Sequence, residues 1–160
     1  AKFIFEEVGY MLEPSEIGCA YGLEQLKKLE AFTKRRNEVT QKHMDFFSKY
    51  NHFFETPKMN ENANSTWFAF PLIVKEKAPF TRTDLQIFLE ERNIQTRVIF
   101  TGNIIRQPAF KEIEKKISKE GYPIADRVMT RGFLIGNHHG LTQEMIDHVH
   151  ESVEIFLKKY

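Results

Sequence analysis

The chain has little cysteine, almost no net charge and no long apolar run, and each absence argues against a class of protein. Its 160 residues include one cysteine, so an intrachain disulfide is impossible and a reducing cytoplasm is the expected compartment. The formal net charge of +1 argues against a nucleic-acid binder that depends on neutralising phosphates. No stretch approaches the ~20 apolar residues that a membrane span needs. We therefore expect a cytoplasmic protein without nucleic-acid or membrane partners.

The six histidines do not follow a metal-binding pattern. His138 and His139 are adjacent, so placing two ligands on one side of a metal is awkward. His148 and His150 lie two apart on an expected helix and point to different faces, unlike an i,i+4 pair. No spacing meets the zinc patterns, so we expect no metal site. Cys19 lies in an apolar helical stretch, where we expect a small buried hydrophobic side chain.

Hydrophobic periodicity predicts helices and three short strands. The composition, 41% hydrophobic and 28% charged, is ordinary for a soluble globular domain. Residues 1–8 predict a strand or extended run, and residues 51–65 are polar and predict a loop. The expected helices are 15–50 with a bend near Lys28, 82–92, 110–118, 123–131 and one from 142 onward. The expected strands are 67–74, 96–100 and 133–135.

These elements predict an α/β (α+β) fold of two layers, a small three-stranded sheet with flanking helices. Residues 1–50 are expected as linking helices and residues 66–160 as the α/β unit. Pro71 has no N–H for a ladder, so its strand is expected at an edge or with a bulge. Gly18 and Gly22 lie four apart on one helix face, which favours either tight packing inside the chain or a site or subunit contact.

Residues 96–110 carry the most informative local pattern. Arg97 begins a strand-like alternation that breaks at Gly102 and Asn103, a pair suited to a tight turn. Arg106 and Gln107 follow directly, before a helix-starting proline. A strand, a turn and an arginine at a helix entry can present a fixed cation to a phosphate or carboxylate. The alternative is a surface loop whose arginine pairs with a local glutamate, and the residues alone leave both open.

Three blocks of sequence resemble the DegT/DnrJ-type sugar aminotransferase family. Residues 9–29, from Gly-Tyr-Met through Ser-Glu-Ile to Leu-Lys-Lys-Leu, resemble its signature segment. Residues 102–110, Gly-Asn-x-x-Arg-Gln-Pro-Ala-Phe, are similar to its 3-dehydratase branch, which acts on nucleotide-linked 4-keto-6-deoxyhexoses. Residues 133–142 resemble another segment of that branch. The blocks occur in family order and, with residues 67–71, cover nearly the whole chain.

The resemblance implies that residues 1–160 are the C-terminal small domain of a fold-type-I pyridoxal-phosphate (PLP) enzyme. The whole enzyme would be a PLP- or pyridoxamine-phosphate (PMP)-dependent 3-dehydratase of CDP- or GDP-4-keto-6-deoxyhexose in O-antigen and deoxysugar biosynthesis, working as a homodimer. The large domain would hold most cofactor contacts, and this chain alone would be inactive, with no catalytic residue. The alternatives are a sugar aminotransferase of the same family and, in another class, a free-standing module that binds sugar nucleotides or dimerises.

The resemblance also implies which residues meet the ligands. Arg97, Asn103, Arg106 and Gln107 match the dehydratase-type pattern and are expected to face the substrate cleft, holding either the sugar-nucleotide diphosphate or an amino donor's carboxylate. Arg106 is the best candidate. Met11 stands where the family usually has an asparagine that reaches the cofactor phosphate of the neighbouring subunit. A thioether cannot donate that hydrogen bond, so the contact is lost or Met11 is a substituted residue.

Overall fold

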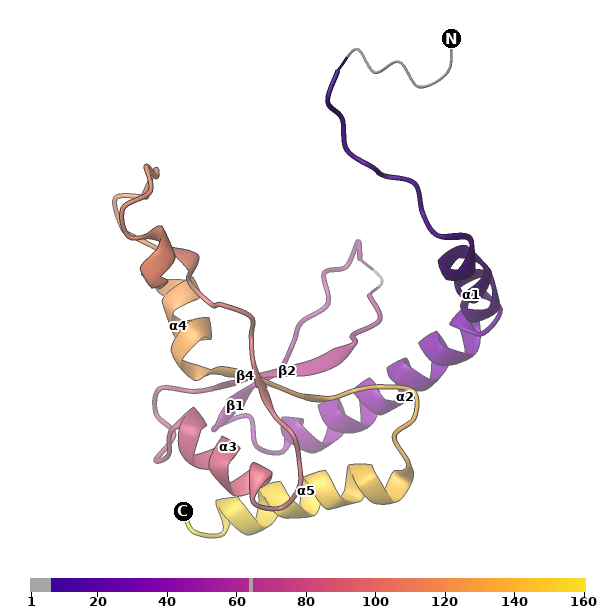
Figure 1. Cartoon of the computed structure of the whole chain (residues 1–160). Coiled ribbons are helices and arrows are strands. Elements are labelled where there is room, and N and C mark those ends of the chain that lie inside the picture. Colours follow the sequence, from indigo (N-terminus) through magenta and orange to yellow (C-terminus); the bar gives the residue numbers. More distant parts are fainter. Residues whose placement is uncertain (1–6, 64) are drawn as a thin grey trace.

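The computed structural model describes residues 7–63 and 65–160 (Figure 1). The extended run expected at residues 1–8 falls mostly outside these residues. Helices α1 (Glu16–Leu26) and α2 (Leu29–Ser48) meet at a break of two residues, which confirms the bend near Lys28. Helices α3 (Arg82–Glu90), α4 (Pro123–Arg131) and α5 (Gln143–Leu157) confirm three more predictions. None of the described helices is long and apolar enough to cross a membrane.

Local side-chain chemistry sets where two of these helices begin. The Thr81 hydroxyl accepts a hydrogen bond from the backbone N–H of Asp84, and the Asp84 carboxylate accepts one from the backbone N–H of Thr81. This capping box satisfies donors that the first turn of α3 leaves free. Thr142 caps α5 with a single bond, in which its hydroxyl accepts from the backbone N–H of Met145.

Among the residues that the structure describes, the sheet has four antiparallel strands in the order β1-β2-β4-β3. The strands are β1 (Phe54–Glu55), β2 (Ala69–Val74), β3 (Arg97–Val98) and β4 (Gly132–Gly136). The three expected strands are present, and β1 is an addition inside the expected loop 51–65. The sequence did not predict β1 because a strand of two residues is too short to show an alternation of apolar and polar side chains.

Two of the predicted elements differ in the structure. Pro71 lies in an interior strand, but β1 pairs only with Ile73 and Val74, so β2 has no neighbour on that side at Pro71. The helix expected at residues 110–118 is absent: two short 3-10 turns, Ile104–Arg106 and Pro108–Phe110, precede a non-helical stretch. The apolar side chains there remain exposed, and a short helix without tertiary packing is not stable.

Three helices cover one face of the sheet and bury the core. Along β2, Phe70, Leu72 and Val74 are buried and alternate with half-buried residues. Leu72 lies opposite Phe133 of β4, so both point to the same face. Figure 1 shows α2, α3 and α5 beneath this face. The core joins these strands to apolar residues of the three helices: Phe46, Phe47, Leu85, Leu89, Val153, Phe156 and Leu157.

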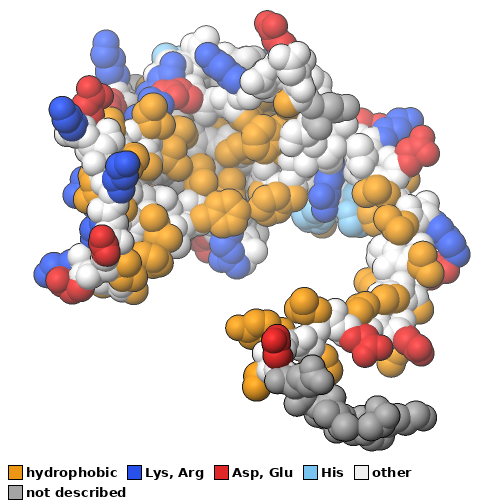
Figure 2. All heavy atoms as spheres, turned by 90° about the horizontal axis from the view of Figure 1, so that it is seen from above, with side chains coloured by type: hydrophobic (Ala, Val, Ile, Leu, Met, Phe, Trp, Pro, Cys, Tyr) orange, Lys and Arg blue, Asp and Glu red, His pale blue; other side chains and the backbone are white. Residues whose placement is uncertain are grey.

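The opposite face of the sheet is largely open. Its half-buried side chains on β2 and β4 are Ala69, Pro71, Ile73 and Leu134. Helix α4 contacts β2 and β4 and covers only one end of this face. Seen from above in Figure 2, apolar side chains gather across the middle of the molecule. The sheet is therefore packed on one side and exposed on the other.

Helix α1 is largely exposed in the described part of the chain. None of its residues is buried, and a Cβ added at Gly18 or Gly22 would meet no atom within 4 Å. The expectation that these glycines allow tight packing inside the chain is therefore wrong. Cys19 is exposed, which corrects the expectation of a buried position. In Figure 1, α1 and residues 7–15 before it extend away from the sheet.

A histidine pair, with His43 buried and His150 half-buried, joins α2, α5 and β4. His43 is 1% exposed, and its Nδ1 lies 3.0 Å from Nε2 of His150. Its Nε2 lies 3.2 Å from the Gly136 carbonyl oxygen, so it donates there. The His150 ring stacks on Phe46 with centroids 4.0 Å apart. Burial lowers the pKa of His43 to about 4, with the His150 charge adding to the effect, and burial lowers the pKa of His150 to about 4.

We predict that the chain loses stability as the pH falls from about 6.5 to about 4. An unfolded histidine takes up a proton near pH 6.5, whereas His43 and His150 stay neutral in the fold until the pH reaches about 4. Because the unfolded state binds more protons in this window, it becomes favoured. The depressed pKa of His43 corresponds to a loss on the order of 2–3 kcal/mol at the low end. Urea denaturation measured between pH 7.5 and 4.5 tests this.

The control is His150→Phe, which keeps a ring over Phe46 and removes one of the two titrating groups. It should unfold more easily at neutral pH, since His43 loses a hydrogen bond, but its stability should depend less on pH. A wild-type free energy of unfolding that is constant from pH 6.5 to 4.5 would contradict the prediction.

Candidate functional site

The loop after β3 lies against helix α4. Gly102 has φ of +64°, in the left-handed region that favours glycine. A Cβ at this position would lie 2.3 Å from Cβ of Met129 and 2.6 Å from its Cα. The loop backbone can therefore approach α4 this closely only because residue 102 has no side chain. This approach brings the next residues of the loop over the first turn of α4.

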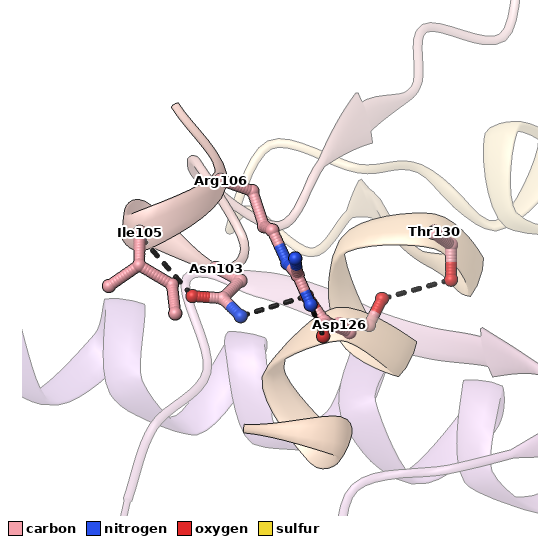
Figure 3. A network of polar contacts seen from close by, with 5 residues as sticks. All are labelled: Asn103, Ile105, Arg106, Asp126 and Thr130. Atoms are coloured by element: carbon pink, nitrogen blue, oxygen red, sulfur yellow. Dashed lines mark hydrogen bonds and ion pairs between the residues drawn. The ribbon is translucent and has the colours of Figure 1, made fainter. Parts of the chain in front are cut away.

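The Asp126 carboxylate of α4 binds two of the predicted site residues (Figure 3). Asn103 is 3% exposed; its Nδ2 donates to Oδ1 of Asp126 at 2.8 Å, and its Oδ1 accepts from the N–H of Ile105 at 3.2 Å. Arg106 donates from Nε to Oδ1 at 3.1 Å and from Nη2 to Oδ2 at 2.9 Å. The structure thus joins Asn103 and Arg106 through a residue that the sequence did not indicate.

This bidentate ion pair sets the charge state of the network. The hydrogen bonds from Arg106 and then Asn103 lower the pKa of Asp126, so its carboxylate is ionised at neutral pH. The Asp126 carboxylate raises the pKa of Arg106. The arginine does have a partner within the chain, but the partner is an aspartate 20 residues away rather than a nearby glutamate. Only its place as an acidic residue in the first turn of a helix marks Asp126 in the sequence.

Gln107 and Arg97 lie apart from this network. The Gln107 amide Nε2 donates to the Thr101 carbonyl at 3.0 Å and so closes the loop on itself. Arg97 lies opposite Leu134, which places it on the open face of the sheet. Within the described residues, Arg97 has no ion pair. The structure therefore brings Asn103 and Arg106 together and leaves Arg97 as a separate cation.

Arg97 also borders a pocket at the start of β3, where Ile135 and Gly136 of β4 have no partner residue in β3. This pocket has a volume of about 440 Å³ and is walled mostly by apolar side chains. Its polar lining comes from His43, Asn93, Gln95, Arg97, His138 and His148. It contains no carboxylate that could pair with a pyridine nitrogen and no lysine. The pocket therefore does not fit a PLP site by itself.

Met11 lies in the non-helical segment before α1 and is 91% exposed. Its thioether has no phosphate-binding donor to offer. Among the described residues, no group of three side chains with metal-binding chemistry comes together. The described part of the chain thus offers hydrogen-bond donors for an anion, at Arg97 and Arg106, but no cofactor cradle.

A family model confirms the resemblance. The model of the DegT/DnrJ/EryC1/StrS aminotransferase family matches residues 1–154. The chain belongs to this family. Among curated family members it is 34% identical over 155 residues to the lipopolysaccharide biosynthesis protein RfbH of Salmonella typhimurium, covering 97% of the chain and 35% of that protein. It is 35% identical over 158 residues to a dTDP-4-dehydro-2,6-dideoxy-D-glucose 3-dehydratase of Saccharopolyspora spinosa, covering 99% and 34%.

A solved family member supports the same placement. The E. coli GDP-4-keto-6-deoxy-D-mannose-3-dehydratase with bound hydrated PLP superposes with a TM-score of 0.82 at 28% identity, covering 94% of this chain and 38% of that one. A structure of that dehydratase with bound GDP-perosamine gives a TM-score of 0.83. The chain spans about a third of the length of the curated relatives it matches. The fold confirms the mixed helix-and-sheet class that the sequence predicted.

We predict that Gly102→Ala destabilises the chain by on the order of 1–3 kcal/mol, because alanine is strained at positive φ and its methyl group collides with Met129. The matched control is Gly121→Ala, where φ is +68° but an added Cβ meets no atom within 4 Å. Urea denaturation of both variants separates the effect of backbone strain at positive φ, which both share, from the effect of the collision with Met129. Equal losses of stability would show that the close approach of the loop to α4 does not matter.

Proposed function

We propose that this chain is the C-terminal small domain of a PLP- or PMP-dependent nucleotide-sugar 3-dehydratase. The substrate class is a CDP- or GDP-linked 4-keto-6-deoxyhexose, and the product would serve O-antigen or deoxysugar biosynthesis. The observation that carries this proposal is the likeness to 3-dehydratases over nearly the whole chain, in sequence and in fold. The segment at residues 102–110, with its dehydratase-type pattern, supports it.

Two exposed surfaces support a place within a larger enzyme. Helix α1 has no buried residue, and its exposed apolar side chains include Ile17, Tyr21 and Leu26. The open face of the sheet adds a second apolar surface. Apolar surfaces of this extent mark interaction sites in soluble proteins. In the proposed enzyme a large PLP-binding domain and a second subunit of the homodimer cover them.

The proposal divides the work between the two domains. PLP or PMP, held by the large domain, supplies the electron sink for loss of the 3-hydroxyl. The small domain supplies guanidinium groups for the anionic parts of the ligands, Arg97 from the open face and Arg106 from the loop. Met11 contributes little to the cofactor phosphate. The free thiol of exposed Cys19 fits a cytoplasmic enzyme.

The second candidate is a sugar aminotransferase, which the family description itself favours. Both reactions use the same cofactor and the same class of substrate, and they differ in what happens to the sugar. A dehydratase removes the oxygen at C3, whereas an aminotransferase replaces the C4 oxygen with an amino group. A non-catalytic module that binds sugar nucleotides or dimerises would change neither position.

The test uses the enzyme encoded by the complete reading frame, incubated with PLP, L-glutamate and GDP- or CDP-4-keto-6-deoxyhexose. Mass spectrometry and NMR of the sugar identify the product. We expect a 3-deoxy sugar and no aminosugar. A 4-amino product would transfer the assignment to the aminotransferases. An unchanged sugar with every nucleotide would contradict both enzyme functions and leave the binding module.

We predict that Arg97→Gln in that enzyme raises KM for the nucleotide sugar about tenfold or more, because a charge-assisted hydrogen bond contributes about 1.5–3 kcal/mol. The control is Arg92→Gln, on the helix side, where the arginine donates to Ser152 and lies over Phe88. Steady-state kinetics compare them. A KM for Arg97→Gln that equals the wild-type and control values would remove Arg97 from the binding site.

A further inference from the structure

We propose that Asp126 is a positioning residue that fixes the Arg106 guanidinium so that its free edge binds an oxyanion of the ligand. The inference rests on the proposed function, because the oxyanion is either the diphosphate of the nucleotide sugar or the carboxylate of the amino donor. Both present a pair of oxygens that a guanidinium fork can bind. Asp126 itself does not touch the ligand.

The hydrogen bonds of Arg106 leave one edge of its guanidinium free. An arginine has five N–H donors in one plane. Asp126 takes the Nε donor and one Nη2 donor, at 3.1 and 2.9 Å. The two donors of Nη1 and the second donor of Nη2 have no partner within the described residues. In the planar guanidinium, one N–H of Nη1 and the second N–H of Nη2 point in the same direction along the edge next to the one that Asp126 occupies. Figure 3 shows the guanidinium lying against Asp126. The Arg106 side chain is 61% exposed, so a ligand can reach this edge.

The carboxylate that holds the fork is itself held in place. Asn103 is buried and donates to Oδ1 of Asp126 at 2.8 Å, the oxygen that also accepts from Nε of Arg106. Asp126 belongs to the first turn of α4, which Gly102 allows the loop to approach. The long arginine side chain therefore starts from a restricted geometry. A restricted side chain loses less conformational entropy when it binds a ligand.

Orientation and charge predict opposite effects when Asp126 is changed. Asp126 carries a negative charge beside Arg106, so simple electrostatics predicts that removing this charge strengthens the binding of an anion. A positioning role predicts weaker binding, because the freed guanidinium no longer presents its edge. Asp126→Asn keeps the size of the side chain and removes the charge. The sign of its effect on affinity therefore decides between the two.

A second ion pair, at the next residue of the same helix, provides a control that distinguishes a positioning role of Asp126 from a purely structural one. Arg127 binds Glu55 at 2.7 Å, and the two side chains are 36% and 35% exposed. This pair ties α4 to β1, away from the loop. Glu55→Gln breaks it as Asp126→Asn breaks the first pair. If the Arg106–Asp126 pair only anchors α4, both variants should be less stable than the wild type, but both should bind ligands with wild-type affinity.

The experiment uses the complete enzyme with Asp126→Asn, Arg106→Lys, the double variant and Glu55→Gln. Titration calorimetry measures the binding of CDP, GDP, dTDP and L-glutamate, and kinetics give KM and kcat. We expect Asp126→Asn and Arg106→Lys each to weaken the same probe about tenfold, and the double variant to be no weaker than either. The affected probe, nucleoside diphosphate or glutamate, identifies the oxyanion. KM should rise with kcat little changed, and Glu55→Gln should match the wild type in binding.

Unchanged or tighter binding by folded Asp126→Asn overturns the inference, as does a wild-type enzyme that binds none of the probes. Thermal denaturation checks folding, and Arg106→Lys, at an exposed position, tests the same fork if Asp126→Asn does not fold. Equal weakening in Glu55→Gln would also overturn it. Binding that depends on Asp126 in an enzyme that leaves the sugar unchanged would support the inference while contradicting the proposed function.

Discussion

The pairing of β2 with β4 is the interaction on which the rest of this structure depends. Five residue pairs join the two strands in one antiparallel register. A shift of β4 by one residue would turn Phe133 away from the helices and bring Leu134 into the core beside Leu72. The same register that buries one face determines the residues of the other face. The open, half-apolar surface that carries Arg97 is thus a consequence of how the core is packed.

The second constraint is the close approach of the loop to α4. It requires a residue without a side chain at position 102, and it places a carboxylate of the helix under an amide and a guanidinium of the loop. Exposed ion pairs contribute little to stability, with a median of about 0–1 kcal/mol. The bidentate pair between Arg106 and Asp126 is therefore better explained by the geometry it imposes than by the stability it adds.

The chain combines a well-packed core with surfaces that its own described residues leave uncovered. The core carries the aromatic rings of Phe46, Phe47 and Phe70, and the histidine pair lies beside them, with His150 stacked on Phe46. By contrast, α1 and the open sheet face expose apolar side chains that a larger assembly would bury. The pocket bordered by Arg97 has neither a lysine nor a carboxylate in its lining, so the described residues do not form a PLP site by themselves.

The sequence alone determined the features that depend on neighbouring residues. The caps at Thr81 and Thr142, the bend near Lys28 and the alternation along β2 follow from local chemistry and periodicity, and the family blocks indicated the fold. Only the tertiary structure decided what depends on contacts between distant residues. The helix expected at 110–118 did not form, because its apolar side chains have no surface to pack against, and Cys19 is exposed. The tertiary structure also gave Arg106 its partner 20 residues away and joined His43 to His150 across 107 residues, because side-chain pairing across a fold leaves no periodic signal in the chain.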